Sequence, residues 1–130
     1  MISFEYLNKS DFSAFARQIF DILADNMTVI APTGNSHEKD FGLWYDAVSD
    51  GMQRPERQII LIKDNETIVG FFQYYTNADT FMMEEIQFRP EYQGKGVFRK
   101  LYGFILKNIR NDLEYIEAYA NVNNQKSIGI

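Results

Sequence analysis

The stretch IQFRPEYQGKGVFRK, residues 86–100, connects a predicted strand to a predicted helix. We expect the strand over 81–88, ended by Pro90, because proline cannot donate a hydrogen bond to a β-ladder. We expect the helix to start at Val97, because apolar residues recur from there at helical spacing. The first amides of a helix have no intrahelical acceptor and lie at the positive end of its dipole. The connection is therefore a candidate site for an anion such as a phosphate.

The residues of this connection suit that chemistry. Gly94 and Gly96 let phosphate oxygens approach the backbone closely, and Lys95 and Arg99 add positive charge. A glycine pair between a strand and a helix also occurs for turn geometry alone, so the loop by itself leaves both interpretations open. Two common phosphate motifs do not fit. The P-loop GxxxxGK[ST] does not occur, and Arg99 stands at the third glycine of GxGxxG.

Predicted strands and helices occupy the rest of the chain. In order, we expect a strand over 2–7, a helix capped by Ser10, a short helix over 39–49, strands over 58–63 and 67–75, the strand and helix above, a strand over 113–120, and the first turns of a helix over 123–130. Two helices show an apolar face, formed by Phe12, Phe15, Ala16, Ile19, Phe20 and Leu23 in the first and by Val97, Leu101, Phe104, Ile105 and Ile109 in the later one. This order predicts a single α+β domain over 1–130, with a mixed sheet covered by helices.

Composition narrows the class of protein. The 130 residues are 45% apolar and 15% aromatic, which is enough for one packed core. The net charge of -5 argues against a nucleic acid partner, because clustered Lys and Arg bind phosphate backbones. The absence of cysteine excludes disulfides and Cys-ligated metals, and no residue cluster predicts a metal site. No signal peptide and no apolar run of about 20 residues is present, so we expect a cytoplasmic protein without membrane association.

Residues 86–96 resemble the coenzyme A-binding region of the GNAT N-acetyltransferases. They are similar to the strand 4, Pro-Glu-Tyr turn and pyrophosphate loop of that family, whose signature is [Q/R]-x-x-G-x-[G/A]. Gln93 and Gly96 match this signature, whereas Phe98 departs from the family, in which Gly or Ala is usual. Its side chain must therefore point away from the phosphates or narrow their site.

Two flanking segments extend the resemblance. Residues 67–71 are similar to strand 3 of the family, and Asn124 with Ser127 resembles its N-x-x-[A/S] motif, in which the asparagine contacts the coenzyme. The resemblance covers residues 57–130 by motif and residues 1–56 by element order. It implies the acyl-CoA N-acyltransferase (GNAT-like) fold: a central mixed, largely antiparallel sheet flanked by helices. It also implies that this chain stops before the last two strands of the family.

The resemblance implies a reaction and a set of site residues. The reaction is transfer of an acetyl group from acetyl-CoA to a primary amine of a small molecule or protein. The implied base is Glu85, with Glu84 as the second choice. Neighbouring residues in a strand point to opposite faces unless a bulge intervenes, and the family usually has a bulge at this place. The alternative interpretation of either glutamate is a solvated charge at the edge of the sheet. The implied cofactor-binding residues, with the oxyanion donor among the first three, are Ile86, Gln87, Phe88, Gln93, Gly94, Lys95, Gly96, Val97, Phe98, Arg99 and Asn124.

The acceptor side is less constrained. Tyr45 falls where the acceptor-binding helices of the family lie, and Tyr74 or Tyr75 on one strand is expected to reach the substrate, with Tyr74 preferred. The tyrosine that serves the family as general acid is expected just beyond Ile130. The exposed strand over 113–120 invites pairing with another chain, and a homodimer is one such arrangement. Two other functions stay open, a non-catalytic acyl-CoA-binding or partner-binding domain with this fold and a nucleotide-binding domain.

Overall fold

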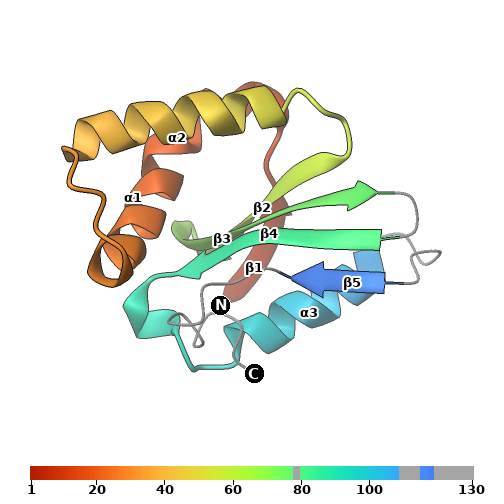
Figure 1. Ribbon diagram of the computed structural model, residues 1–130. Coiled ribbons are helices and arrows are strands. Elements are labelled where there is room, and N and C mark those ends of the chain that lie inside the picture. The colour runs from red at the N-terminus through yellow and green to blue at the C-terminus, as the bar shows by residue number, and fades with distance from the viewer. Residues whose placement is uncertain (78–79, 109–114, 119–130) are drawn as a thin grey trace.

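A computed structural model of the chain describes residues 1–77, 80–108 and 115–118 (Figure 1). Its strands are β1 (Ile2–Tyr6), β2 (Arg57–Asp64), β3 (Thr67–Asn77), β4 (Thr80–Phe88) and β5 (Tyr115–Ala118). Its helices are α1 (Phe12–Ile30), α2 (His37–Gly51) and α3 (Val97–Asn108), with the short 3-10 helices η1 (Lys9–Asp11) and η2 (Pro90–Tyr92). The α+β class predicted from the sequence is confirmed.

The strands form one sheet in the order β1-β2-β3-β4-β5. The first four are antiparallel neighbours, and β5 pairs with β4 in parallel from Thr80↔Tyr115 to Met83↔Ala118. The sheet is therefore mixed and largely antiparallel, as expected. Helices cover both of its faces, with α1 and α2 on one side and α3 on the other (Figure 1).

Strands β2 and β3 are apolar on both faces because helices cover both. In β2, Ile60 and Ile62 belong to the core under α3, whereas Ile59 and Leu61 belong to the core under α1. Successive side chains of a strand point to opposite faces, and here both faces are covered. The sequence of β2 is therefore a continuous apolar run and not an alternating one.

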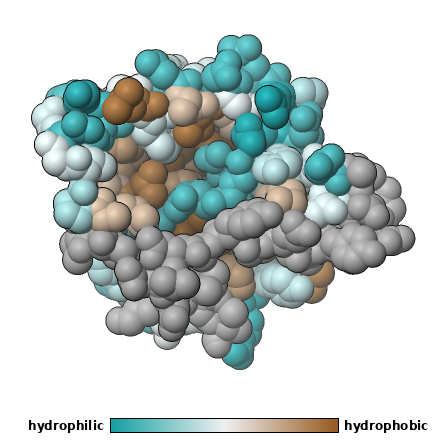
Figure 2. Space-filling model, in the orientation of Figure 1, coloured by the Kyte–Doolittle hydropathy of each residue, from teal (hydrophilic) through white to brown (hydrophobic). Residues whose placement is uncertain are grey.

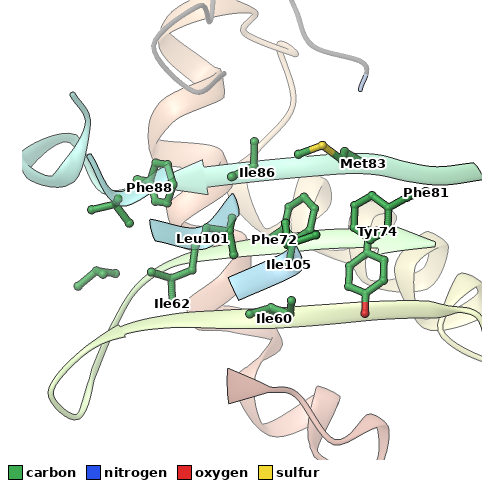
Figure 3. Close-up of a cluster of buried hydrophobic side chains, with 12 residues drawn as sticks. Ile60, Ile62, Phe72, Tyr74, Phe81, Met83, Ile86, Phe88, Leu101 and Ile105 are labelled. Carbon is green, nitrogen blue, oxygen red and sulfur yellow. The ribbon is translucent and has the colours of Figure 1, made fainter. Parts of the chain in front are cut away.

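The core under α3 is made of apolar side chains (Figure 3). Leu101 and Ile105 of α3 are buried against the sheet. In the same core the rings of Phe72, Tyr74 and Phe81 stack. The ring centroids are 5.5 Å apart for Phe72 and Tyr74 and 4.7 Å apart for Tyr74 and Phe81. The apolar face predicted for this helix is confirmed up to Phe104 and Ile105, and Ile109 lies outside the described residues.

The first two helices differ from prediction at their ends. Ser10 does not cap α1: it lies inside η1, where its own amide donates to Asn8 Oδ1 at 3.1 Å. The side chain of Asn8 takes that place because it accepts from the residue two positions on, as in an Asx turn. Helix α2 starts two residues earlier than expected, at His37, because Ser36 Oγ accepts the amide of Lys39 at 3.1 Å.

One glycine is needed where β3 meets β4. A Cβ on Gly70 would lie 2.6 Å from the backbone oxygen of Gln87, closer than real Cβ atoms come. Gly70 pairs with Phe88, and such close opposition fits a pair without mutual hydrogen bonds. The residue therefore lets the two strands meet beside the loop that follows β4.

Some expectations fall outside the described residues. These are the helix over 123–130 and the ends of the strand predicted over 113–120, of which the structure describes β5. Among the described residues, no helix is long and apolar enough to cross a membrane.

Candidate functional site

A bulge in β4 brings two neighbouring glutamates to the same face of the sheet. Gln73 of β3 pairs with Glu85, but the next residue, Tyr74, pairs with Met83, so Glu84 is the extra residue. Glu84 reaches Gln73 and Arg57, and Glu85 is hydrogen-bonded on the side of α1. Without the bulge the two carboxylates would point to opposite faces.

Glu84 is an ion-pair partner. Arg57 at the start of β2 donates to both of its carboxylate oxygens, Nε to Oε1 at 2.6 Å and Nη2 to Oε2 at 2.8 Å. The two side chains are only 16% and 25% exposed, and the Arg57 guanidinium also lies 5.0 Å from the ring centre of Tyr75. A bidentate pair of this kind fixes the position and orientation of the Glu84 side chain.

Glu85 has a different environment. Burial raises the pKa of its carboxyl above the ordinary value, and the charge of Glu84 acts in the same direction, while the hydrogen bond from Gln87 opposes them. That bond runs from Gln87 Nε2 to Glu85 Oε1 at 2.6 Å. A carboxylate with a raised pKa binds a proton more readily near neutral pH, which is the property of a general base.

A second hydrogen-bonded layer lies behind Glu85. Asn26 of α1 donates from Nδ2 to Gln87 Oε1 at 2.9 Å and to the backbone oxygen of Phe88 at 2.8 Å. The same Phe88 oxygen accepts Gln93 Nε2 at 3.2 Å. This network of side chains and one backbone oxygen therefore links Glu85 to the start of the glycine loop.

The backbone of β4 offers donors between the glutamates and the loop. The amide of Arg89 donates to the oxygen of Val69 in β3 at 2.8 Å. Because hydrogen-bonded and open pairs alternate in an antiparallel ladder, the amides of Gln87 and Glu85 also face β3. Those of Ile86 and Phe88 point the other way, toward the edge on which β5 lies. The sequence placed Gln87 with these donors, but by this alternation its own amide faces β3.

The loop after β4 is open and glycine-dependent. Gly94 and Gly96 have φ of 73° and 79°, a left-handed conformation that favours glycine. Among the described residues, no atom beyond their chain neighbours lies within 4 Å of a Cβ built on either. Both residues are therefore kept by backbone conformation, and both leave space beside the chain for a ligand.

Helix α3 begins directly after this loop. Its first intrahelical hydrogen bond is from the amide of Lys100 to the oxygen of Gly96 at 3.2 Å, so the amides of 97–99 have no intrahelical acceptor. Lys95 and Arg99 are exposed beside them. Phe98 packs against the core under α3, which removes its bulk from the loop. The fit to a phosphate group is therefore good, although a larger side chain stands where the family has Gly or Ala.

Two residues predicted to contact the acceptor do not lie beside the two glutamates. Tyr74 is buried in the core under α3, on the face opposite to the glutamates, because the bulge changes the phase of β4 but not that of β3. The strand residue on the glutamate side is Tyr75, beside Arg57. Tyr45 stacks on Phe12 and lines a cavity of about 410 Å³ between η1, the start of α1 and the end of α2, whose lining includes neither glutamate.

A recess lies on the glutamate side of the sheet. Figure 2, in the orientation of Figure 1, shows the surface hollowed below α2, with apolar atoms at the bottom and hydrophilic atoms beside them. An apolar floor with a few polar groups is typical of a small-molecule site.

Asn124 lies outside the described residues. Within the described part of the chain, no group of three or more His, Asp or Glu side chains is arranged to hold a metal ion. Sequence reasoning missed Asn26 and Arg57, because no local pattern connects them to β4.

Comparisons with known proteins agree on one fold. The model of the acetyltransferase (GNAT) family matches residues 16–130. A search of curated proteins finds no match. Among solved structures, the PaiA N-acetyltransferase of Thermoplasma acidophilum in complex with coenzyme A is similar at a TM-score of 0.74 and 14% identity, over 98% of this chain and 83% of that one.

Two other similar structures carry different acceptor names. One is the ribosomal-protein-alanine N-acetyltransferase of Brucella melitensis biovar Abortus (TM-score 0.65, 12% identity, 98% of this chain and 87% of that one). The other is an aminoglycoside acetyltransferase from an uncultured soil sample in complex with sisomicin (TM-score 0.65, 11% identity, 98% and 82%). At such identities these likenesses establish the fold.

Proposed function

The chain belongs to the GNAT family of acetyltransferases, and from this premise we propose that it transfers an acetyl group from acetyl-CoA to a primary amine. The observation that carries the proposal is the order of groups along β4. A glutamate with a raised pKa stands at a bulge, two amides then face the β5 edge, and a glycine loop leads into a helix start. A base, an oxyanion donor and an anion site follow one another in that order.

The coenzyme is expected at the glycine loop. The amides of 94–99 would take the pyrophosphate, because a helix N-terminus favours negative charge and the two glycines allow close approach. Lys95 and Arg99 would add attraction at the surface. A similar structure was solved with coenzyme A, which supports this assignment.

The proposed reaction is direct attack of the amine on the thioester. A lysine-like amine has a pKa near ~10.4, so it must lose a proton to attack, and Glu85 would accept that proton directly or through water. The amine nitrogen bonds to the acetyl carbon, and the carbonyl oxygen becomes an oxyanion that the amides of Ile86 or Phe88 would stabilise. The carbon–sulfur bond then breaks, and coenzyme A leaves as a thiolate. The nitrogen loses its second proton in the same step, and that proton neutralises the thiolate, so the products are a neutral amide and the thiol of coenzyme A.

The acceptor is a primary amine of open identity. The recess on the glutamate side would receive it, and its apolar floor would favour an amine carried on an apolar stem. The acceptors named for similar structures range from an aminoglycoside to a ribosomal protein, so both small molecules and proteins belong in a screen.

Coenzyme binding is tested first by thermal unfolding with acetyl-CoA, coenzyme A, ATP and NADH. A ligand at 100 times its dissociation constant stabilises the folded state by about 2.7 kcal/mol, a readable shift. We expect a shift from the two coenzyme A compounds and none from ATP or NADH. ATP or NADH binding in their place would support a nucleotide-binding domain and contradict the proposal.

A matched pair of variants locates the site. Gly96→Glu places a carboxylate at the proposed phosphate site, and Gly34→Glu makes the same change at another exposed glycine, with φ of 81° and no neighbour within 4 Å of its Cβ. The two variants therefore carry the same charge and similar backbone strain. We expect Gly96→Glu to abolish the coenzyme shift and Gly34→Glu to retain it. Equal loss in both would place the coenzyme elsewhere.

A further inference from the structure

One polar side chain is enclosed in the core. Gln87 is 1% exposed and is the only buried polar or charged residue in the part of the chain that the structure describes. Its surroundings on that face are largely apolar, since Phe71, its partner in β3, is fully buried in the core under α1. A buried amide costs free energy unless both of its ends are hydrogen-bonded, so its presence calls for a reason.

Both ends of the Gln87 amide are bonded, and their orientation is fixed from outside. The backbone oxygen of Phe88 can only accept, so Asn26 must turn Nδ2 toward it, at 2.8 Å. The same nitrogen lies 2.9 Å from the Gln87 side chain, which must therefore present Oε1 to Asn26. Gln87 is then left with Nε2 facing Glu85 Oε1, at 2.6 Å. Because the Phe88 oxygen can only accept, the orientation of both amides is fixed, and Glu85 accepts a hydrogen bond from Gln87.

We propose that Asn26 and Gln87 are positioning residues for Glu85: together they orient its carboxylate through Oε1 and stabilise its ionised form. This inference rests on the proposed function, because it names the groups that prepare the base. Oε2 of Glu85 is then the oxygen that takes the proton of the amine. Neither amide touches the reacting atoms, so neither is a catalytic residue.

Among the groups around Glu85, the Gln87 side chain is the one whose hydrogen bond favours the ionised carboxylate. On β4 the charged neighbour is Glu84, which is paired with Arg57 of β2. Strand β3 places the neutral Gln73 opposite Glu85, and α1 contributes the neutral Asn26. Burial and Glu84 raise the pKa of Glu85 and Gln87 lowers it. Without the donor, the pKa of Glu85 rises further and a smaller fraction of the base is ionised at a given pH.

The test is a carbon-detected NMR titration of the protein labelled with ¹³C at its glutamate carboxyls. The Glu85 signal is assigned by its loss in Glu85→Gln. Removing the donor with Gln87→Met is expected to raise the titration midpoint of Glu85 by about one pH unit. Asn26→Leu is expected to raise it too, because Gln87 is then free to turn its oxygen toward Glu85. In the double variant the second change adds nothing, since both act through one bond.

The control is Gln73→Met, the same substitution on the same face of the adjacent strand. Gln73 donates to Glu84 at 3.3 Å rather than to Glu85, so the Glu85 midpoint is expected to stay within about 0.3 pH unit of wild type. A purely structural network would lower stability in the variants without moving this midpoint. Unchanged midpoints in Gln87→Met and Asn26→Leu would overturn the proposal.

A measurement on the wild type keeps the test independent of folding of the variants. The side-chain NH₂ signals of Gln87 are expected to titrate with the midpoint of Glu85, because one of these protons is donated to it. Signals that do not respond would also overturn the proposal. Neither experiment needs an acceptor, so failure here is separate from failure of the transfer reaction. Once an acceptor is found, the acidic limb of kcat/KM in Gln87→Met should move up by the same amount, about tenfold lower activity on that limb.

Discussion

The two faces of β4 carry side chains of different chemical character. Toward α3 the strand presents Phe81, Met83, Ile86 and Phe88, all buried in an apolar core (Figure 3). Toward α1 it presents two carboxylates and a buried amide, joined by hydrogen bonds to three other elements. The bulge at Glu84 separates the two patterns. One strand thus stabilises the core with one face and presents polar groups on the other, and the bulge that allows this leaves Glu84 outside the strand pairing.

The largest effect on stability is expected on the apolar face. Phe72→Ala removes a fully buried ring under α3 and should lower the free energy of unfolding by about 3–5 kcal/mol. Leu43→Ala, at a side chain of α2 that is 59% exposed, should change it by less than about 0.5 kcal/mol. Denaturant unfolding monitored by circular dichroism measures both. A loss below 1 kcal/mol for Phe72→Ala would mean that the core is not where the structure places it.

On the polar face, the pair formed by Arg57 and Glu84 should contribute next. Arg57→Met leaves a poorly exposed carboxylate without its partner, and we expect a loss of about 2–3 kcal/mol. The control is Arg17→Met, whose partner Glu38 forms an ion pair with side chains 45% and 74% exposed. This change should lower stability less than Arg57→Met does, because water screens an exposed pair. Adding Glu84→Gln to Arg57→Met should recover part of the loss, and no recovery would contradict this account of the pair.

Replacing two glycines by alanine should change the stability of the protein in opposite directions. Gly70→Ala sets a Cβ 2.6 Å from the backbone oxygen of Gln87, and we expect a loss of about 1–3 kcal/mol from this crowding. Gly103→Ala in the middle of α3 meets no atom within 4 Å and should stabilise the protein by about 0.5–1 kcal/mol through helix propensity. Thermal unfolding of both variants tests the close approach of β3 and β4. A Gly70→Ala variant as stable as wild type would place these strands further apart.

The smallest effect is on the pH dependence of stability. The folded state raises the pKa of Glu85, so the folded protein binds the proton more tightly than the unfolded chain. Stability therefore falls as pH rises from the ordinary carboxyl pKa of 4.5 through the raised value. Glu85→Gln lacks this loss, so its stability relative to wild type should increase between pH 4 and pH 7. If the stability of Glu85→Gln relative to wild type instead decreased over this pH range, the folded state would favour the ionised form of Glu85.

The sequence predicted the fold well because its signals are local. Apolar runs and the 86–100 stretch are continuous in the chain, and they indicated the order of the elements. The largely antiparallel arrangement of the sheet was expected from the family resemblance. Element ends were less accurate where a side chain decides them, as at Ser10 and His37. Propensity cannot show which of two neighbouring polar residues accepts the hydrogen bond.

The candidate site was predictable only where it is local. The glycine loop and both glutamates stood out in the sequence, and the bulge was expected from the family resemblance alone. The contact between Asn26 and Gln87 spans 61 residues, and no spacing in α1 indicates it. Tyr74 and Tyr75 could not be assigned to faces, because the phase of β3 depends on its pairing with neighbours.

The most direct test of the central claim is acetyl transfer by wild type and Glu85→Gln, with acetyl-CoA affinity measured on the same samples. A panel of spermidine, lysine-containing and alanine-ended peptides and an aminoglycoside, with detection of the released thiol, supplies the acceptors. We predict that Glu85→Gln loses about 10²–10⁴-fold in turnover while keeping its affinity for acetyl-CoA. Full turnover in Glu85→Gln would contradict the assignment of the base. Coenzyme binding by wild type with no transfer to any amine would instead support a non-catalytic acyl-CoA-binding domain.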